Sequence, residues 1–155
     1  MTWRIIRRPL AVLVFLLATI GTFNMARWVT DRDPPILYDG ARALADSIEQ
    51  GGTIGIEFNV FRHRICPVET QRWLYDSEGN RHAIPSFTTG LERLAGREVY
   101  QRTITIPQAA AVGPARYQVV LDYTCNPLAR ILSWPVRVYS PPIEFEIVPG
   151  DRAPS

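Results

Sequence analysis

The chain of 155 residues contains no lysine, and all seventeen of its basic residues are arginine. It also has only two cysteines and two histidines, of which only His63 and Cys66 lie close in sequence, whereas the four ligands of a closed zinc site typically come in two closely spaced pairs. A nucleophile elbow, a phosphate-binding glycine loop, a dinucleotide-binding fingerprint and a paired-carboxylate motif are lacking as well. We therefore predict no catalytic residue, no metal site and no cofactor, and we do not expect an enzyme.

Acidic residues are missing from the first 29 positions, which carry four arginines. From residue 30 onward thirteen arginines face fifteen acidic residues, so this part has a formal charge of −2. Nucleic-acid binding needs clustered positive charge that displaces counterions from the phosphates. The slightly acidic body predicts no nucleic-acid partner.

Charge is absent from residues 10–26, a run of seventeen mostly apolar residues. As a helix, the segment from Trp3 to Trp28 would extend about 37 Å, enough to place an indole at each interface of a bilayer core of about 30 Å. We predict that residues 1–29 form a cytoplasmic tip and an uncleaved transmembrane anchor, which contacts the lipid bilayer through residues 9–28. A cleaved signal peptide and a helix buried in a soluble core are the alternatives.

The flanks of this run differ in charge. Arg4, Arg7 and Arg8 precede it, whereas the sequence RWVTDRD that follows is balanced. The positive-inside rule then keeps the N-terminus in the cytoplasm and the rest of the chain outside, in a single pass through the inner (cytoplasmic) membrane. Two consecutive prolines within residues 30–36 predict a short, stiff stalk.

Beyond the stalk, turn residues recur every eight to fifteen positions, which is typical of many short strands. Alternating apolar side chains indicate the inward faces of these strands. Residues 40–52 fit either a short helix or extended structure, and we favour extended structure. In residues 70–76, Trp73 and Tyr75 alternate with Arg72 and Leu74, so the sequence does not decide which of these two sets points inward. Two inward faces are clear: Ile54, Ile56, Phe58 and Val60 in one strand, and Tyr117, Val119, Leu121, Tyr123 and Cys125 in another.

Cys66 and Cys125 each end such a strand at an inward position. Arg62 and Arg64 fall on the same parity as Cys66, which implies a bulge near Phe61. We predict a disulfide across the core, closing a loop of about 60 residues and stabilising the fold by about 4 kcal/mol. Two buried free thiols are the alternative.

A cysteine followed by Trp73, and a second cysteine preceded two places earlier by Tyr123, resemble the immunoglobulin-like superfamily. Tyr117 is an equally good candidate for the corner tyrosine of that family. The resemblance implies an all-β, immunoglobulin-like antiparallel sandwich over residues 37–149, followed by a tail at 150–155. Its core markers would be Trp73, Tyr117 and Tyr123.

The layout is also similar to small membrane-anchored proteins of bacteria and tailed bacteriophages. In those proteins the sequence DSEG follows the second core strand and CNPL follows a late tyrosine-rich strand; here these are residues 76–79 and 125–128. This resemblance implies an extracytoplasmic β domain and brings no activity with it.

Four weaker signals remain, and three of them have a simpler interpretation. The His-x-x-Cys spacing of His63 and Cys66 fits a surface histidine beside a structural cysteine better than a metal site. Residues 76–80 fit a hairpin turn better than a cation loop. Exposed aromatic side chains at Phe87, Trp134 and Tyr139 would be a place to look for a contact surface. Arginines on or beside strands would form a basic face or, more simply, solvated outer faces: Arg62, Arg64, Arg72, Arg81, Arg93, Arg97, Arg102 and Arg116.

The functional hypothesis is a membrane-anchored extracytoplasmic module that binds or supports an envelope or virion protein. The alternative is a membrane-acting accessory protein, of the lysis or superinfection-exclusion kind, in which the helix is the active part. Thr19, Gly21, Thr22 and Asn24 would then provide a face for helix packing.

Overall fold

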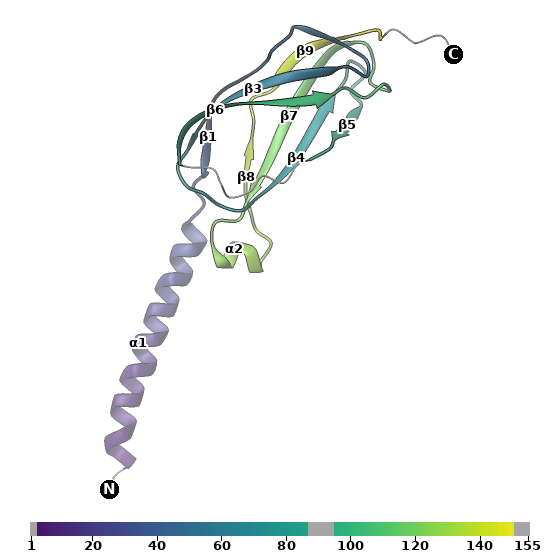
Figure 1. The fold of residues 1–155 in the computed structure, drawn as a ribbon. Coiled ribbons are helices and arrows are strands. Elements are labelled where there is room, and N and C mark those ends of the chain that lie inside the picture. Colours follow the sequence, from purple (N-terminus) through teal and green to yellow (C-terminus); the bar gives the residue numbers. More distant parts are fainter. Residues whose placement is uncertain (1–2, 87–94, 151–155) are drawn as a thin grey trace.

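The computed structural model of the chain describes residues 3–86 and 95–150. A long N-terminal helix leads into a β-rich body, as Figure 1 shows. The elements follow in the order α1 (Trp3–Thr30), β1 (Ile36–Ala43), β2 (Ser47–Glu49), β3 (Thr53–Arg62), β4 (Val68–Tyr75), β5 (Arg81–Ile84), β6 (Gly96–Thr105), β7 (Gly113–Tyr123), α2 (Pro127–Ile131), β8 (Val136–Tyr139) and β9 (Ile143–Val148).

Helix α1 projects away from the β body (Figure 1). Its stretch Pro9–Thr30 is long and apolar enough to cross a membrane, and none of its apolar window is buried inside the protein. Large side chains such as Phe15, Leu17 and Phe23 are 61 to 71% exposed. The prediction of an apolar helix of spanning length is confirmed, and the alternative of a helix buried in a soluble core is wrong.

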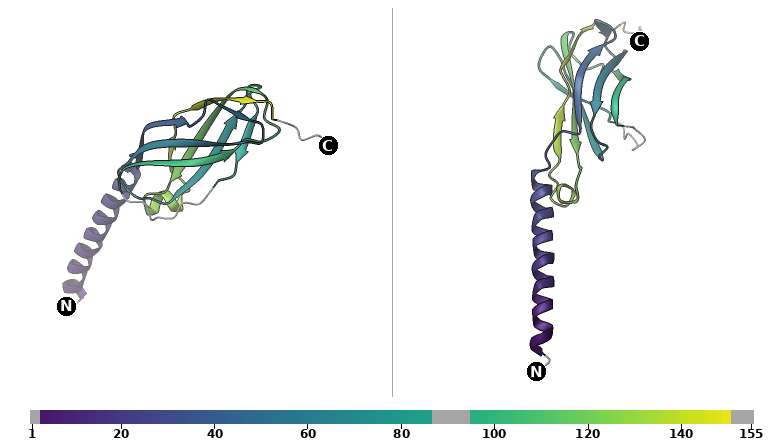
Figure 2. Two further views of the ribbon diagram at one scale, coloured as in Figure 1. Left: turned by 45° about the horizontal axis from the view of Figure 1, so that its top comes forward. Right: turned by 90° about the vertical axis from the view of Figure 1, so that its left-hand side faces the viewer.

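The β body consists of two sheets that face each other, seen edge-on in the right-hand view of Figure 2. One sheet has the strand order β1-β3-β6 and the other the order β2-β9-β7-β4-β5. Strand β8 pairs with β7 beside β9, so β8 and β9 share one edge of β7. Strand β2 runs parallel to β9, which makes the second sheet mixed rather than purely antiparallel as predicted.

One hydrophobic core lies between the sheets and draws on both. Strand β3 contributes the four apolar side chains that its alternation predicted, all at most 3% exposed. Tyr117 and Tyr123 of β7 are 1% and 2% exposed. Phe58 stacks on Tyr100 of the neighbouring strand with ring centroids 5.3 Å apart, so aromatic contacts reinforce the β3–β6 pair.

Strand β4 presents Arg72 and Leu74 to the core, and the prediction of Trp73 as a core residue is wrong. The buried guanidinium of Arg72 is satisfied by three acceptors from different elements. It donates from Nε to the Tyr117 hydroxyl at 2.7 Å, and from its two Nη atoms to the carbonyl oxygens of Pro85 and Thr103 at 2.8 and 3.2 Å. Trp73 lies on the outer face, where the Arg81 guanidinium stacks 4.2 Å from its ring centroid.

The ambiguous residues 40–52 are extended, with a break. Strand β1 pairs with β3, whereas β2 pairs with β9 of the other sheet, so the chain crosses between layers at residues 44–46. A single helix over this segment could not supply an edge to both sheets.

Candidate functional site at the junction of helix and β domain

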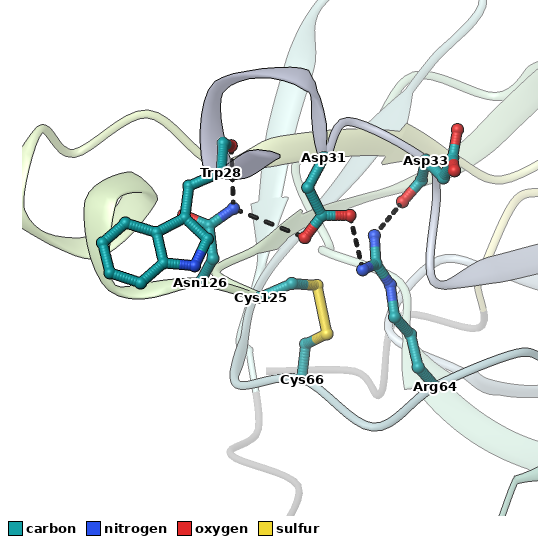
Figure 3. The surroundings of a disulfide bond; sticks show 7 residues. All are labelled: Trp28, Asp31, Asp33, Arg64, Cys66, Cys125 and Asn126. Carbon is teal, nitrogen blue, oxygen red and sulfur yellow. Dashed lines mark hydrogen bonds and ion pairs between the residues drawn. A yellow bond between two sulfur atoms is a disulfide. The ribbon is translucent and has the colours of Figure 1, made fainter. Parts of the chain in front are cut away.

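The Cys66–Cys125 disulfide lies close to the end of α1, near Trp28 and Asp31 (Figure 3), with the two Cα atoms 4.9 Å apart. It continues the β4–β7 ladder beyond the pair Val68 and Tyr123, because the Thr124 amide donates to the Pro67 carbonyl oxygen at 2.9 Å. The bond therefore joins neighbouring strands of one sheet, and the prediction that it crosses the core between the layers is wrong.

The physical reason is where β3 ends. Strand β3 pairs with β6 without interruption as far as Arg62, so no bulge occurs near Phe61. Arg62 itself takes the last inward position and is 7% exposed. Cys66 then belongs to the connection between β3 and β4, which has already turned towards the other sheet.

Arg64 fastens the segment that follows α1. Its Nη1 donates to the Asp31 carboxylate at 2.7 Å, and its Nη2 donates to the carbonyl oxygen of Asp33 at 2.7 Å (Figure 3). The Arg64 hydrogen bond is the largest influence on Asp31 and holds the pKa of that carboxyl below its usual range. The ion pair thus links the end of the helix to the loop that carries Cys66.

Asn126 links α1, α2 and the disulfide, since it directly follows Cys125. Its Oδ1 accepts a hydrogen bond from the Ala129 amide at 2.8 Å, which caps the N-terminus of α2. Its Nδ2 donates to the carbonyl oxygen of Trp28 at 3.2 Å (Figure 3). One side chain therefore satisfies an orphan acceptor of α1 and an orphan donor of α2.

Arg32 makes a third attachment. Its guanidinium donates to the carbonyl oxygens of Trp134 and Pro135 at 2.9 and 3.0 Å and stacks 4.1 Å from the Trp134 ring centroid. Nearby, Pro35 is buried and its carbonyl oxygen accepts from the His63 amide at 2.9 Å. Residues 30–36 were predicted to form a stalk; instead, residues 31–35 lie against the β body and Ile36 begins β1.

The opposite end of the β body is organised by Asp76, whose side chain is fully buried in the β4–β5 turn. Its carboxylate accepts hydrogen bonds from the Glu78, Asn80 and Ala111 amides at 2.9 to 3.1 Å. The Asn80 side-chain amide and the His82 ring add contacts at 3.2 and 2.8 Å. Burial alone would raise the pKa of Asp76, but these hydrogen bonds outweigh burial and hold the pKa well below its usual range.

These contacts bear out the hairpin reading of residues 76–80, because both carboxylate oxygens of Asp76 bind donors of the protein itself. Next to the turn, an open groove of about 980 Å³ runs over the outer face of the second sheet. Arg116 stacks 5.1 Å from the Tyr75 ring centroid at this groove. Its other charged lining residues are acidic: Asp46, Asp76, Glu144 and Glu146.

The arginines named as a basic face do not all lie on one exposed surface. Arg62 and Arg72 are buried, and Arg64 and Arg97 pair with Asp31 and Asp39. The others stack on aromatic rings: Arg81 on Trp73, Arg102 on Tyr100 and Arg116 on Tyr75. Arg93 and Phe87 lie outside the described residues.

The remaining predicted candidates separate in space. His63 packs edge-on against Phe61 with ring centroids 4.8 Å apart, while the Cys66 sulfur is bonded to Cys125. Within the part of the chain that the structure describes, no cluster of three or more His, Cys, Asp or Glu side chains is placed to hold a metal ion. Trp134 and Tyr139 are exposed, as expected. Sequence reasoning missed Asn126 and Arg32, although the Asn-Pro pair before a short apolar run is a helix-capping signal.

No protein-family model and no curated protein matches the chain. Among solved structures, it is similar to the Pseudomonas fluorescens alkylpurine DNA glycosylase AlkC bound to DNA containing an abasic site analog. The identity is 12% and the TM-score 0.45, over 75% of this chain and 31% of that one. This chain therefore spans under a third of that protein's length.

This neighbour is an enzyme in complex with DNA, and it contradicts our two predictions of no enzyme and no nucleic-acid partner, which we withdraw. A likeness at this TM-score carries no argument for glycosylase activity or DNA binding in this chain.

Proposed function

We propose that the chain is a single-pass membrane protein that displays its β domain outside the cytoplasm as a binding or structural module of a bacterial envelope, encoded by the bacterium or by a phage. One observation carries the proposal: the stretch Pro9–Thr30 is long and apolar enough to cross a membrane, and none of its apolar window is buried inside the protein. An apolar helix of that length finds a matching environment in a bilayer, where its backbone is satisfied internally.

The orientation follows from charge and chemistry. Arg4, Arg7 and Arg8 favour a cytoplasmic N-terminus. At the other flank, the sequence RWVTDRD holds two arginines and two aspartates, so this segment carries no net positive charge. The Cys66–Cys125 disulfide supports the same orientation, because such bonds persist in oxidising compartments and are rare in the cytoplasm.

The strand order supports an immunoglobulin-like sandwich. In that family one sheet contains strands A, B and E, and the other contains G, F and C, extended by C′ in variable-type domains. Here β1-β3-β6 matches the first series and β9-β7-β4-β5 the second. Two features depart from the family pattern: the disulfide lies within one sheet, and Trp73 faces outward.

The groove beside Asp76 is the surface we propose for a partner, because it lies at the end of the domain away from α1 and would face outward from the membrane. Three exposed or half-exposed acidic residues, Asp46, Glu144 and Glu146, favour a partner segment with positive charge. An envelope or virion protein would supply that segment.

Membrane anchoring and sidedness are tested together in cells that produce the full chain with a C-terminal epitope tag. Alkaline carbonate should leave the chain in the membrane fraction, and protease added to spheroplasts should remove the tag. Leu17→Arg places a charge mid-helix at a cost of about 3 kcal/mol and should release a large fraction of the chain. Leu37→Arg, an exposed leucine of β1, is the matched control and should leave the chain membrane-bound.

Extraction of the unaltered chain by carbonate would overturn the anchor. A tag that stays protected in spheroplasts, yet is digested after the membrane is permeabilised, would overturn the orientation.

The helix-active alternative has less support from the structure. Thr19, Thr22 and Asn24 all donate to carbonyl oxygens four residues earlier in α1, at 2.8 to 2.9 Å. Each of these side chains therefore already donates a hydrogen bond within its own helix, which weakens the case for a partner helix. Replacing residues 9–28 by an unrelated transmembrane helix separates the two hypotheses, because a display module should keep its function and a membrane-acting helix should lose it.

A further inference from the structure

Helix α2 and the turn after it expose large apolar side chains at the end of the β body nearest to α1. Ile131, Leu132 and Trp134 are 79, 58 and 44% exposed. They lie within residues 131–134 of the connection between β7 and β8, where Ile131 ends the short helix α2, Leu132 is its C-cap and Trp134 follows in the turn. An exposed apolar cluster of this kind marks a contact surface in a soluble protein, or a surface that meets lipid.

Residues 126–134, called the α2 tip below, are held in one conformation. Asn126 caps α2, and Pro127 occupies its first turn. After the helix, Ser133 adopts the left-handed conformation with φ of 48°, and the Trp134 amide donates to the Ala129 carbonyl oxygen at 2.9 Å. The turn reverses the direction of the chain and leaves the three apolar side chains exposed. A non-glycine residue adopts a left-handed backbone conformation only where the surrounding structure offsets its conformational cost.

The tip lies beside the last turns of α1 (Figure 1). The Asn126 side chain contacts the Trp28 carbonyl oxygen, and Asn24 and Trp28, one turn apart, are the half-buried residues of this part of the helix. If Pro9–Thr30 spans a bilayer, these turns lie at its outer interface. The turns of α1 that would lie at the membrane–water interface are therefore adjacent to the apolar tip.

We propose that the α2 tip inserts into the outer interface of the same bilayer that α1 spans, giving the domain a second membrane contact. The proposal deepens the proposed function and rests on it. Tryptophan is the side chain that favours this depth, since its ring is apolar and its indole N–H binds water or headgroups. Arg27 and Arg130, both exposed nearby, would reach anionic lipid phosphates.

Two attachment points have a structural consequence. A single helix lets a domain rotate and tilt over the membrane, whereas a second contact beside it restricts both motions. The hydrogen bonds of Arg32, Arg64 and Asn126 tie the end of α1 and the linker to the β body, so the restriction would extend to the whole domain. The groove beside Asp76 would then be presented away from the lipid surface.

The test uses the full chain reconstituted in vesicles of zwitterionic and anionic lipids, with lipids brominated either near the headgroup or deep in the acyl chain. Three single-tryptophan variants are made by changing the other tryptophans to phenylalanine, leaving Trp28, Trp73 or Trp134. Bromine quenches only indoles within contact range. Trp134 should be quenched at least about half as strongly as Trp28, and more by bromine near the headgroup than by deep bromine.

Trp73 is the matched control, because it is an outer-face tryptophan of β4 and should stay unquenched. Quenching of Trp28 without Trp134 would overturn the inserted tip while leaving the anchor in place. Loss of quenching at both positions would overturn the proposed function itself. The competing explanation is that a second copy of the chain covers the tip. In that case Trp134 would be quenched neither by brominated lipid nor by aqueous acrylamide, and this result would overturn the proposal.

A second pair of variants guards against misfolding. In the single-Trp134 background, Ile131→Asp should lower quenching of Trp134 several-fold, since a carboxylate resists transfer into the interface. Arg116→Asp, a change of similar kind at the other end of the domain, should leave quenching unchanged. Equal quenching in all these variants would contradict insertion through the α2 tip.

Discussion

The two ends of the β domain are stabilised by different kinds of interaction. At the end near α1, a covalent bond between Cys66 and Cys125 is surrounded by contacts from Arg32, Arg64 and Asn126. At the far end no disulfide occurs among the described residues, and the buried carboxylate of Asp76 gathers the β4–β5 turn and the loop before β7. The first end exposes the apolar side chains of Ile131, Leu132 and Trp134, whereas the groove at the second end is lined by exposed acidic side chains.

The difference fits two environments. A carboxylate buried among hydrogen-bond donors holds its loops only while it stays ionised, which water at neutral pH ensures. A disulfide is independent of protonation and of the local dielectric constant, so it suits a surface that meets lipid headgroups. The comparison makes five predictions, which begin with the largest expected effect on stability.

Removing the disulfide should have the largest effect. The double change Cys66→Ala and Cys125→Ala frees a sequence separation of 59 residues and should lower the free energy of unfolding by about 4 kcal/mol. Urea titration of the full chain in detergent, followed by near-ultraviolet circular dichroism, measures this loss. The variant should unfold at the same urea concentration as the unaltered protein treated with reductant. Unfolding at the urea concentration of the oxidised, unaltered protein would contradict the prediction.

Asp76→Ala should cost about 3 kcal/mol, because it leaves several buried donors unsatisfied. Ser77→Ala is the matched control in the same turn, as it removes only the hydrogen bond to the Val112 carbonyl oxygen, and it should cost about 1 kcal/mol. If both variants unfold at the same urea concentration, Asp76 does not organise this end.

The same carboxylate should give the domain a pH dependence. Hydrogen bonds lower the folded pKa of Asp76 below the value of about 3.9 of a free aspartate. Its contribution is then complete above that pH and is lost as the pH falls further, since the unfolded state binds the proton first. Stability measured between about pH 5 and pH 2 should therefore fall more steeply in the unaltered protein than in Asp76→Asn.

At the other end, Arg64→Gln should have a smaller effect on stability, about 1 kcal/mol, because Arg64 and Asp31 are each about a third exposed or less and their pairing is partly screened. Its local effect should be clearer. Hydrogen exchange should accelerate at the His63 amide, which donates to the Pro35 carbonyl oxygen, while the Asn80 amide at the far end should exchange as before. Faster hydrogen exchange at both amides would mean that the junction does not open separately from the rest of the domain.

A pair of arginine changes compares the two ends directly. Arg32 and Arg116 each stack on an aromatic ring, but Arg32 also donates to two carbonyl oxygens. Arg116→Ala should cost about 0.5 kcal/mol and Arg32→Ala about 1.5 kcal/mol, both read from urea midpoints. The reverse order would show that the linker does not depend on Arg32 for its attachment.

Several features could be predicted from the sequence because they depend on local patterns. The apolar run fixes the helix, since few other structures satisfy the backbone of such a stretch. Alternation fixes which side chains of β3 and β7 enter the core. With two cysteines in the chain, the disulfide has one possible intramolecular pairing, although the sequence does not say which strands it joins.

The tertiary structure decided what depends on partners distant in the chain. Arg72 rather than Trp73 faces inward because Tyr117, Pro85 and Thr103 meet around its guanidinium, an arrangement that no local pattern of β4 reveals. The linker docks because Arg64 and Asn126 reach it from separate loops. In β4 both faces mix apolar and polar side chains, so alternation specifies two faces but not which one is buried; that choice depends on the partners that satisfy the buried polar groups.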